Sequence, residues 1–144
     1  MKEEDMFNRI IIAIDGSDHS SRALSYAREM AERFGASLWL VYAYPQTSDL
    51  RSYEQFGKLI ARRKREGQSI LDEARKILGE INCEINEELL EGPEAEAILS
   101  VAEIQKVGLI LMGTRGLGSL EGLLLGSVSR KVTYHAFCPV MLVP

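Results

Sequence analysis

Short apolar runs that alternate with helix-like segments constrain the fold of this chain more than any other feature. The strand-like runs are 8–14, 37–44, 81–92, 107–113 and 139–144. In the segments between them, apolar residues recur every three or four positions, which is the period of a helix that packs on one side. Strands that alternate with helices pair in parallel through right-handed crossovers. The sequence therefore predicts a single α/β domain over residues 1–144.

The character of each run predicts its place in the sheet. Runs 8–14 and 107–113 are continuously apolar, as in strands buried on both faces, so we expect them side by side at the centre. Run 81–92 is charged, which is typical of an edge strand. A Rossmann-like five-stranded parallel sheet of order 3-2-1-4-5, with helices on both faces, satisfies these constraints. Ligands of such sheets bind at the carboxyl ends of strands one and four, where the strand order reverses.

Capping and breaking residues predict where the helices begin and end. Asp18 or Ser20 is expected to cap the first helix, and Gly35 to end it. Segment 46–79 is polar at first and then helical, and Gly67 is expected to kink or split that helix. The remaining two helices are expected at 94–106 and 126–136.

The glycine-rich segment 113–126 leaves the predicted fourth strand at the switch point, opposite Asp15 at the end of strand one. Glycines let backbone N–H groups turn inwards and approach a ligand closely. The helix that follows presents N–H groups without intrahelical partners, which suit an anion. Ser127 and Ser129 can add hydroxyl donors, and Arg115 or Arg130 can add positive charge. One interpretation is a phosphate site, and the other is a surface loop whose glycines serve only turns.

Two common phosphate-binding motifs do not match this segment. The phosphate-loop motif requires a lysine after its last glycine, and no glycine of the segment is followed by one. Gly116, Gly118 and Gly122 miss the spacing of the dinucleotide fingerprint by one residue, and that fingerprint follows strand one.

The spacing of the segment matches a different pattern. Gly113-Thr114-Arg115-Gly116, nine further residues and Gly126-Ser127 form G-x-x-G-x9-G-[ST]. This pattern, the stretches LILMGTRG, LLLGSVS and HAFCPVMLVP, and the first strand leading into AIDGSDHSSRAL resemble the universal stress protein family. The resemblance covers the chain from about Asn8 to Pro144. Because the glycine motif is kept, the chain resembles the ATP-binding branch of the family rather than the branch without the motif.

The resemblance implies that ATP with Mg²⁺ lies between strands one and four. Asp15 would approach the ribose or a phosphate-bound Mg²⁺, and the backbone around Val41 and Tyr42 would recognise adenine. Met112 and the first glycines would line ribose and phosphates, and Gly126 with its neighbours would close around the triphosphate. The implied nucleotide-binding residues are Ala13, Ile14, Asp15, Val41, Tyr42, Met112, Gly113, Thr114, Arg115, Gly116, Gly118, Gly126, Ser127 and Val128.

The function implied by the resemblance is that of an ATP-binding regulatory protein of the stress response that acts as a homodimer. The alternative is a dimeric interaction module whose pocket is empty or holds AMP, a cyclic nucleotide or another adenylate. No residue of the sequence stands out as a base that activates water, so at most slow ATP hydrolysis is expected.

Charge and hydropathy limit the kinds of partner that this protein is expected to bind. The net charge of −4 argues against a nucleic-acid partner, and no apolar run is long enough to span a membrane. The acidic start does not resemble a secretory signal, so a cytoplasmic location is expected. Run 139–144 is an apolar predicted edge, which is expected to pair with a second copy. The basic stretch 58–65 is interpreted as a solvated helix face, with an anionic partner as the alternative.

Overall fold

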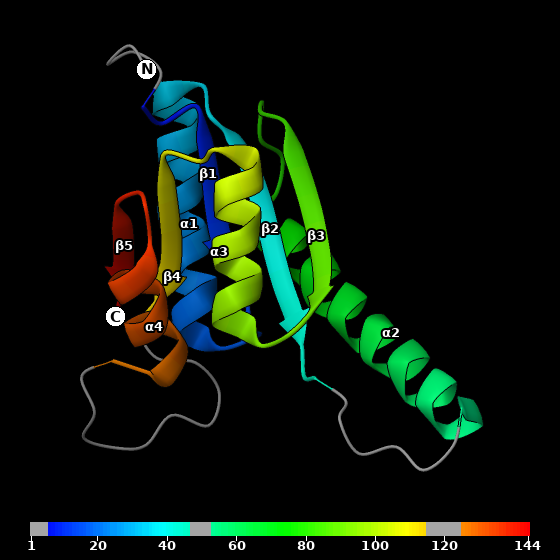
Figure 1. The fold of residues 1–144 in the computed structure, drawn as a ribbon. Helices are drawn as coiled ribbons and strands as arrows, with labels where there is room; N and C mark the ends of the chain where they lie inside the picture. The colour runs from blue at the N-terminus through cyan, green and yellow to red at the C-terminus, as the bar shows by residue number, and fades with distance from the viewer. Residues whose placement is uncertain (1–5, 47–52, 115–124) are drawn as a thin grey trace.

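The computed structural model describes residues 6–46, 53–114 and 125–144. Strands and helices alternate along these residues: β1 (Arg9–Ala13), α1 (Asp18–Phe34), β2 (Ser37–Tyr44), α2 (Tyr53–Leu78), β3 (Ile85–Glu91), α3 (Glu94–Gln105), β4 (Leu109–Gly113), α4 (Ser127–His135) and β5 (Val140–Val143). The strands form one five-stranded parallel sheet in the order β3-β2-β1-β4-β5 (Figure 1). The predicted fold and strand order are confirmed.

Two helices cover each face of the sheet. Because side chains alternate across a strand, Ile10 and Ile12 of β1 face α1 and α2, whereas Ile11 of β1 faces α3 and α4. All three isoleucines are completely buried. The central strand is therefore apolar on both sides, as its continuous sequence run predicts. Among the described residues, no helix combines the length and the apolar character needed to cross a membrane.

The start of α1 differs from the sequence prediction. Ser17, rather than Asp18 or Ser20, is the N-cap, and its side chain accepts a hydrogen bond from the Ser20 N–H at 3.2 Å. Ser17 is the last residue with an extended backbone, whereas Asp18 already lies in the helix, so only Ser17 can reach back to the free N–H groups. Gly35 ends the helix in the left-handed conformation (φ 66°), as predicted.

Helix α2 runs without interruption through Gly67, so the predicted kink or split is wrong. A Cβ atom at Gly67 would lie 2.5 Å from Cδ1 of Leu89 and 2.8 Å from the ring of Tyr42. The glycine therefore serves close packing of α2 on β2 and β3 rather than a break in the helix. Beyond Gly67 towards its N-terminus, α2 projects past the carboxyl ends of the strands (Figure 1).

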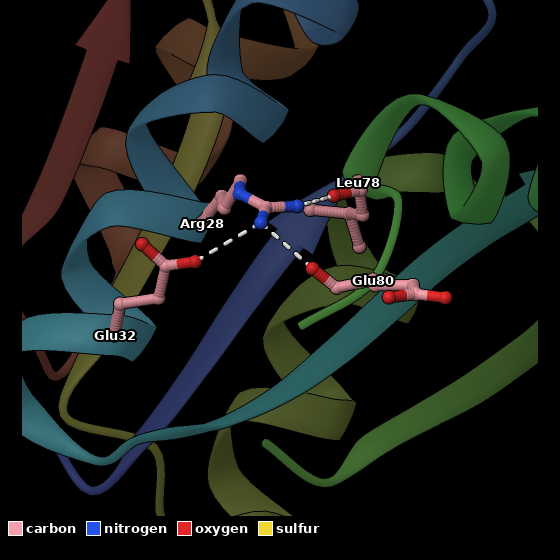
Figure 2. A network of polar contacts seen from close by, with 4 residues as sticks. All are labelled: Arg28, Glu32, Leu78 and Glu80. Atoms are coloured by element: carbon pink, nitrogen blue, oxygen red, sulfur yellow. Dashed lines mark hydrogen bonds and ion pairs between the residues drawn. The ribbon is translucent and has the colours of Figure 1, made fainter. Parts of the chain in front are cut away.

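An arginine of α1 fixes the opposite end of α2. The guanidinium of Arg28 donates to the carbonyl of Leu78 and, at 2.7 Å, to the carbonyl of Glu80, and it pairs with Glu32 at 3.1 Å (Figure 2). Leu78 is the last residue of α2, so the guanidinium satisfies a carbonyl that the helix leaves without a partner. The C-terminal end of α2 is thereby held to α1.

Candidate functional site

The carboxyl ends of β1 and β4 lie side by side at the switch point of the sheet, and Asp15 follows β1 there. A carboxylate oxygen of Asp15 accepts a hydrogen bond from the Ser17 N–H at 2.8 Å. This bond ties the half-buried Asp15 side chain to the start of α1. Asp15 is therefore held by the turn at the predicted ligand edge.

The end of β2 is longer than the end of β1, which determines the backbone groups that face the site. Val41 is the last β2 residue paired with β1, and its carbonyl accepts the Ile14 N–H at 2.9 Å. Backbone groups alternate in direction along a strand, so Tyr42 points towards β3 and Ala43 points past the end of β1. Ala43, rather than Val41 or Tyr42, directs backbone N–H and C=O groups towards the space beyond β1.

Gly113 at the end of β4 packs against the first turn of α1. A Cβ atom on this residue would lie 2.5 Å from the Cβ of His19, 3.0 Å from its carbonyl carbon and 3.2 Å from the Ser20 nitrogen. Next to it, the Thr114 hydroxyl lies 3.4 Å from Nδ1 of His19. The structure thus gives Gly113 a packing role in addition to the ligand role that the sequence motif predicts.

The carbonyl of Thr114 joins the end of β4 to the start of α4. It accepts the Gly126 N–H at 2.7 Å and the Ser129 hydroxyl at 2.8 Å. The Ser129 hydroxyl also lies 3.1 Å from the Gly126 carbonyl, and this serine is only 2% exposed. Ser129 therefore closes the stem of the glycine-rich segment, and the prediction that its hydroxyl is a donor for the ligand is wrong.

The N-terminus of α4 forms the positive side of the site. Gly126 is its N-cap, with an extended backbone and no side-chain cap bond. The first N–H groups of a helix lack intrahelical partners and carry the positive end of the helix dipole, which suits an anion. Ser127 is exposed and Val128 is half-buried at this end. The two residues stand where the sequence motif places them.

Acidic side chains make the site negative on the side of the carboxyl ends of β1 and β2, away from the N-terminus of α4. Glu94, the first residue of α3, keeps surface in water, but burial and then the charge of Asp15 raise the pKa of its carboxyl. Burial also raises the pKa of the Tyr42 hydroxyl, followed by the charges of Glu94, Glu66 and Asp15. Sequence analysis did not single out Glu94, because an acidic residue in the first turn of a helix is common for its dipole alone.

The floor of the site is apolar. Ala13, Val41 and Met112 lie towards the carboxyl ends of their strands on the face covered by α3 and α4, and all three are buried. Ile14, also buried, packs on the opposite face. The four predicted residues thus lie near the carboxyl ends of the strands, but not all on the same face of the sheet.

Three predicted site residues, Arg115, Gly116 and Gly118, lie outside the described residues. A cavity of about 230 Å³ lies on the other side of Asp15, between α1 and α2, and its lining includes Ile14, Gly16, Leu24 and Ile70. This cavity is mostly apolar and does not reach Thr114 or Gly126.

The carboxylates near Asp15 suit a magnesium ion that is held partly by ligand phosphates better than one held by protein side chains alone. Among the residues that the structure describes, no three His, Cys, Asp or Glu side chains gather as a metal site. Magnesium in nucleotide sites commonly binds through one or two carboxylates and the phosphates of the ligand. Asp15, with Glu94 in its electrostatic neighbourhood, suits that arrangement.

Comparisons with known proteins identify the family and the fold of this chain. A universal stress protein of Thermus aquaticus is 42% identical over 138 residues, which cover 96% of this chain and 99% of that protein. The structure of a universal stress protein from Lactobacillus plantarum superposes with a TM-score of 0.86 at 20% identity, covering 96% and 98% of the two chains. A universal stress protein solved in complex with cyclic AMP has a TM-score of 0.63 at 26% identity, covering 95% and 96%.

The model of the universal stress protein family matches residues 6–144, which is nearly the whole chain. The match includes both sides of the candidate site, from Asp15 to the Gly126–Ser127 end of the glycine motif. The chain belongs to the universal stress protein family.

Proposed function

We propose that this protein is a cytoplasmic regulatory protein of the stress response that binds ATP with Mg²⁺ between the carboxyl ends of β1 and β4. The closed stem at Thr114 carries this proposal, because it holds the uncapped N-terminus of α4 beside the end of β4. The glycine motif of the sequence begins and ends at this stem. The family member solved with cyclic AMP supports an adenine nucleotide as the ligand.

The two electrostatic sides of the site orient the nucleotide. The phosphates lie at the N-terminus of α4, near Ser127 and Val128, where backbone N–H groups and the helix dipole favour negative charge. The ribose hydroxyls face Asp15, which accepts hydrogen bonds. Adenine lies towards β2, where the Ala43 N–H and C=O offer one donor and one acceptor to its edge.

Magnesium would be held by the phosphates with Asp15 as a protein partner. When bound, it neutralises phosphate charge next to the negative side of the site. Arg115, Gly116 and Gly118 complete the phosphate side in this proposal, as the sequence motif implies.

Binding alone is sufficient for a regulatory role. A ligand that binds only the folded state stabilises it by RT ln(1 + [L]/Kd), which is about 2.7 kcal/mol at a hundred times Kd. Such an effect raises the midpoint of thermal unfolding by roughly 5–10 °C for a domain of this size. Nucleotide occupancy therefore changes how readily the stem and its neighbours open.

Calorimetric titration tests the ligand. We expect heat and saturation with ATP and Mg²⁺, and a loss of affinity in Asp15→Asn and Gly126→Ala. Asparagine keeps an oxygen for the Ser17 N–H and removes only the charge. Ser100→Ala, at an exposed position of α3, is the matched control.

Titrations with ADP, AMP and cyclic AMP separate the alternatives. Binding of AMP or cyclic AMP without binding of ATP would favour the alternative of an interaction module with an adenylate pocket. An absence of heat with all four nucleotides would contradict nucleotide binding in any form.

We propose in addition that β5 joins two copies into a homodimer through residues 139–144. β5 is an edge of the sheet, and Pro139 and Val143 accept hydrogen bonds from β4, so Val140 and Leu142 direct backbone groups outwards. Close to this edge, Tyr134 and Phe137 are 84% and 93% exposed, which is unusual for large apolar side chains. Pairing of this edge with a second copy would satisfy its outward backbone groups.

A proline at Leu142 tests the homodimer. Leu142→Pro removes an outward N–H and leaves the hydrogen bonds to β4, so the monomer keeps its fold. We expect light scattering to show half the mass of the wild-type protein under the same conditions. Val140→Lys is a second variant that blocks edge pairing by charge. An unchanged mass in both variants would refute pairing through β5.

A further inference from the structure

The N-terminal half of α2 packs little on the body of the domain, which it contacts at Arg63, whose guanidinium donates to the Pro45 carbonyl at 2.7 Å. None of residues 55–66 is buried, whereas Leu71, Ala74 and Leu78 of the second half are. At about 1.5 Å per residue this stretch extends roughly 18 Å, and it runs past the carboxyl ends of the strands and away from β3 (Figure 1). We call residues 55–66 the α2 overhang.

The α2 overhang and the β3 edge carry opposite and equal formal charges. The overhang contains five basic residues and one acidic residue, for a charge of +4. Residues 84–91, which we call the acidic edge, contain four glutamates and no basic residue, for a charge of −4. Such a concentration of charge is marked in a chain with a net charge of −4. The basic stretch noted in the sequence is therefore matched by a surface of the same protein.

The acidic edge is an outer strand of the sheet. Glu84 accepts the Leu38 N–H and Tyr44 accepts the Gly92 N–H, so the odd-numbered residues of β3 direct their backbone groups outwards. Near the start of this edge, Arg75 of α2 donates to the Ile85 carbonyl at 3.3 Å and pairs with Glu87 at 3.2 Å. An edge strand of this kind is commonly covered by a helix.

The α2 overhang also has an apolar face. Phe56 and Ile60 continue, at helical spacing, the stripe that is buried further along α2, and Leu59 flanks them. A helix of this length is marginal without packing, and Gly57 in its interior weakens it by about 1 kcal/mol. Packing against another surface would stabilise this half of the helix.

We propose that the α2 overhang of one copy docks on the acidic edge of a second copy, and that a two-fold axis repeats the contact. Charge complementarity selects the second copy, because the overhang would repel its own counterpart. The contact joins the basic side chains of the overhang to the glutamates of the acidic edge, because Leu89 and Leu90 pack on opposite faces of the sheet within their own copy. A flat anionic membrane is a less suitable partner than a second copy. The apolar face of the overhang continues the buried stripe of α2, so it points to the side of the helix where the sheet lies. This surface is distinct from β5 and is independent of nucleotide binding.

Two charge-reversal variants test the contact. Arg62→Glu/Lys64→Glu/Arg65→Glu changes the overhang from +4 to −2, and Glu84→Lys/Glu88→Lys/Glu91→Lys changes the acidic edge from −4 to +2. In each variant the two surfaces carry the same sign, so each variant alone should not form the contact. In an equimolar mixture both contacts join opposite signs, so association should return.

Light scattering at about 0.05 M and about 0.5 M salt measures the result, because screening at high salt weakens exposed charge pairs. We expect the wild-type mass at low salt to be twice the mass of either variant and twice its own mass at high salt. The 1:1 mixture should regain the wild-type mass at low salt. If β5 also forms a dimer, the contact links dimers, so the wild-type mass at low salt should be at least twice the mass of either variant.

Matched controls separate the contact from general charge effects and from misfolding. Arg33→Glu/Lys76→Glu reverses two exposed charges elsewhere and should keep the wild-type mass. Arg62→Gln/Lys64→Gln/Arg65→Gln keeps good helix formers and should lose the contact without an acidic overhang. A wild-type mass that does not depend on salt, or a folded mixture that fails to associate, would overturn the proposal. Salt-sensitive binding to phosphatidylglycerol vesicles with unchanged mass would overturn it as well.

Discussion

Replacement of Gly113 by alanine tests the packing of the sheet against α1 most directly. The added Cβ would lie 2.5 Å from the Cβ of His19, about 1 Å closer than an ordinary carbon contact. The next atoms, at 3.0 and 3.2 Å, belong to the backbone of His19 and Ser20 and cannot rotate away. We therefore expect the first turn of α1 to shift, together with the Ser17 cap that holds it.

The magnitude follows from overpacking. Extra atoms in a well-packed region cost about 1–3 kcal/mol, and the rigid backbone neighbours place Gly113→Ala at the upper end. Alanine also lowers the conformational entropy of the unfolded chain, which offsets about 0.4–1 kcal/mol of this loss of stability. A net loss of about 2 kcal/mol follows, which lowers the midpoint of thermal unfolding by roughly 4–8 °C.

Urea denaturation of nucleotide-free protein, followed by circular dichroism, measures this change. The matched control is Gly57→Ala in α2, where no atom lies within 4 Å of the added Cβ. In a helix interior this second change should raise stability by about 0.5–1 kcal/mol. If Gly113→Ala is as stable as the wild-type protein, Gly113 does not serve packing, and its role would be limited to the approach of a ligand.

Three other changes have directions that follow from the structure. Ser17→Ala removes the N-cap of α1 and should cost about 1 kcal/mol in urea denaturation. Ser129→Ala removes a buried hydroxyl bond to the Thr114 carbonyl and should cost about 0.5–1.5 kcal/mol. The raised pKa of Glu94 means that its contribution to stability is fully present below pH 4.5 and is lost as the pH rises through the folded pKa. Glu94→Gln should therefore increase stability at neutral pH and flatten the pH dependence, because burial first and the charge of Asp15 second disfavour the ionised carboxyl.

These three predictions share simple controls. Ser100→Ala, an exposed serine within α3, should change stability by less than about 0.5 kcal/mol. Equal losses for Ser100→Ala and Ser129→Ala would contradict the stem described at Thr114. Denaturation of Glu94→Gln at two pH values on either side of pH 4.5 checks the last prediction, and an unchanged slope would contradict it.

The architecture could be predicted from sequence because apolar residues are continuous in buried parallel strands but recur every three or four positions in the helices that cover them. Residues 10–14 of the run at 8–14 have no polar position, which is typical of a strand covered on both faces, and β1 occupies most of them. The charged run at 81–92 became the edge strand β3 for the corresponding reason. The strand order followed from placing the most apolar runs at the centre and the charged run at an edge, with parallel pairing through right-handed crossovers.

The details of the site could not be predicted in the same way, because they depend on contacts between distant residues. Glycine is usually a helix breaker, but at Gly67 its small size is required by the ring of Tyr42. Ser129 and Ser127 look alike in the sequence, and only the position of the Thr114 carbonyl separates a structural hydroxyl from an exposed one. The direction of the Ala43 backbone depends on where β1 ends, which sequence patterns locate only approximately.

The closed stem at Thr114 has a consequence for how such a domain can be modified. Two hydrogen bonds to the Thr114 carbonyl hold the end of β4 beside the start of α4. Doubling the length of a connection between fixed ends costs only about 0.6 kcal/mol. The residues between Thr114 and Gly126 can therefore be replaced by a segment of different sequence or length. Such replacements are expected to change ligand preference and to leave the sheet and the helices unaltered.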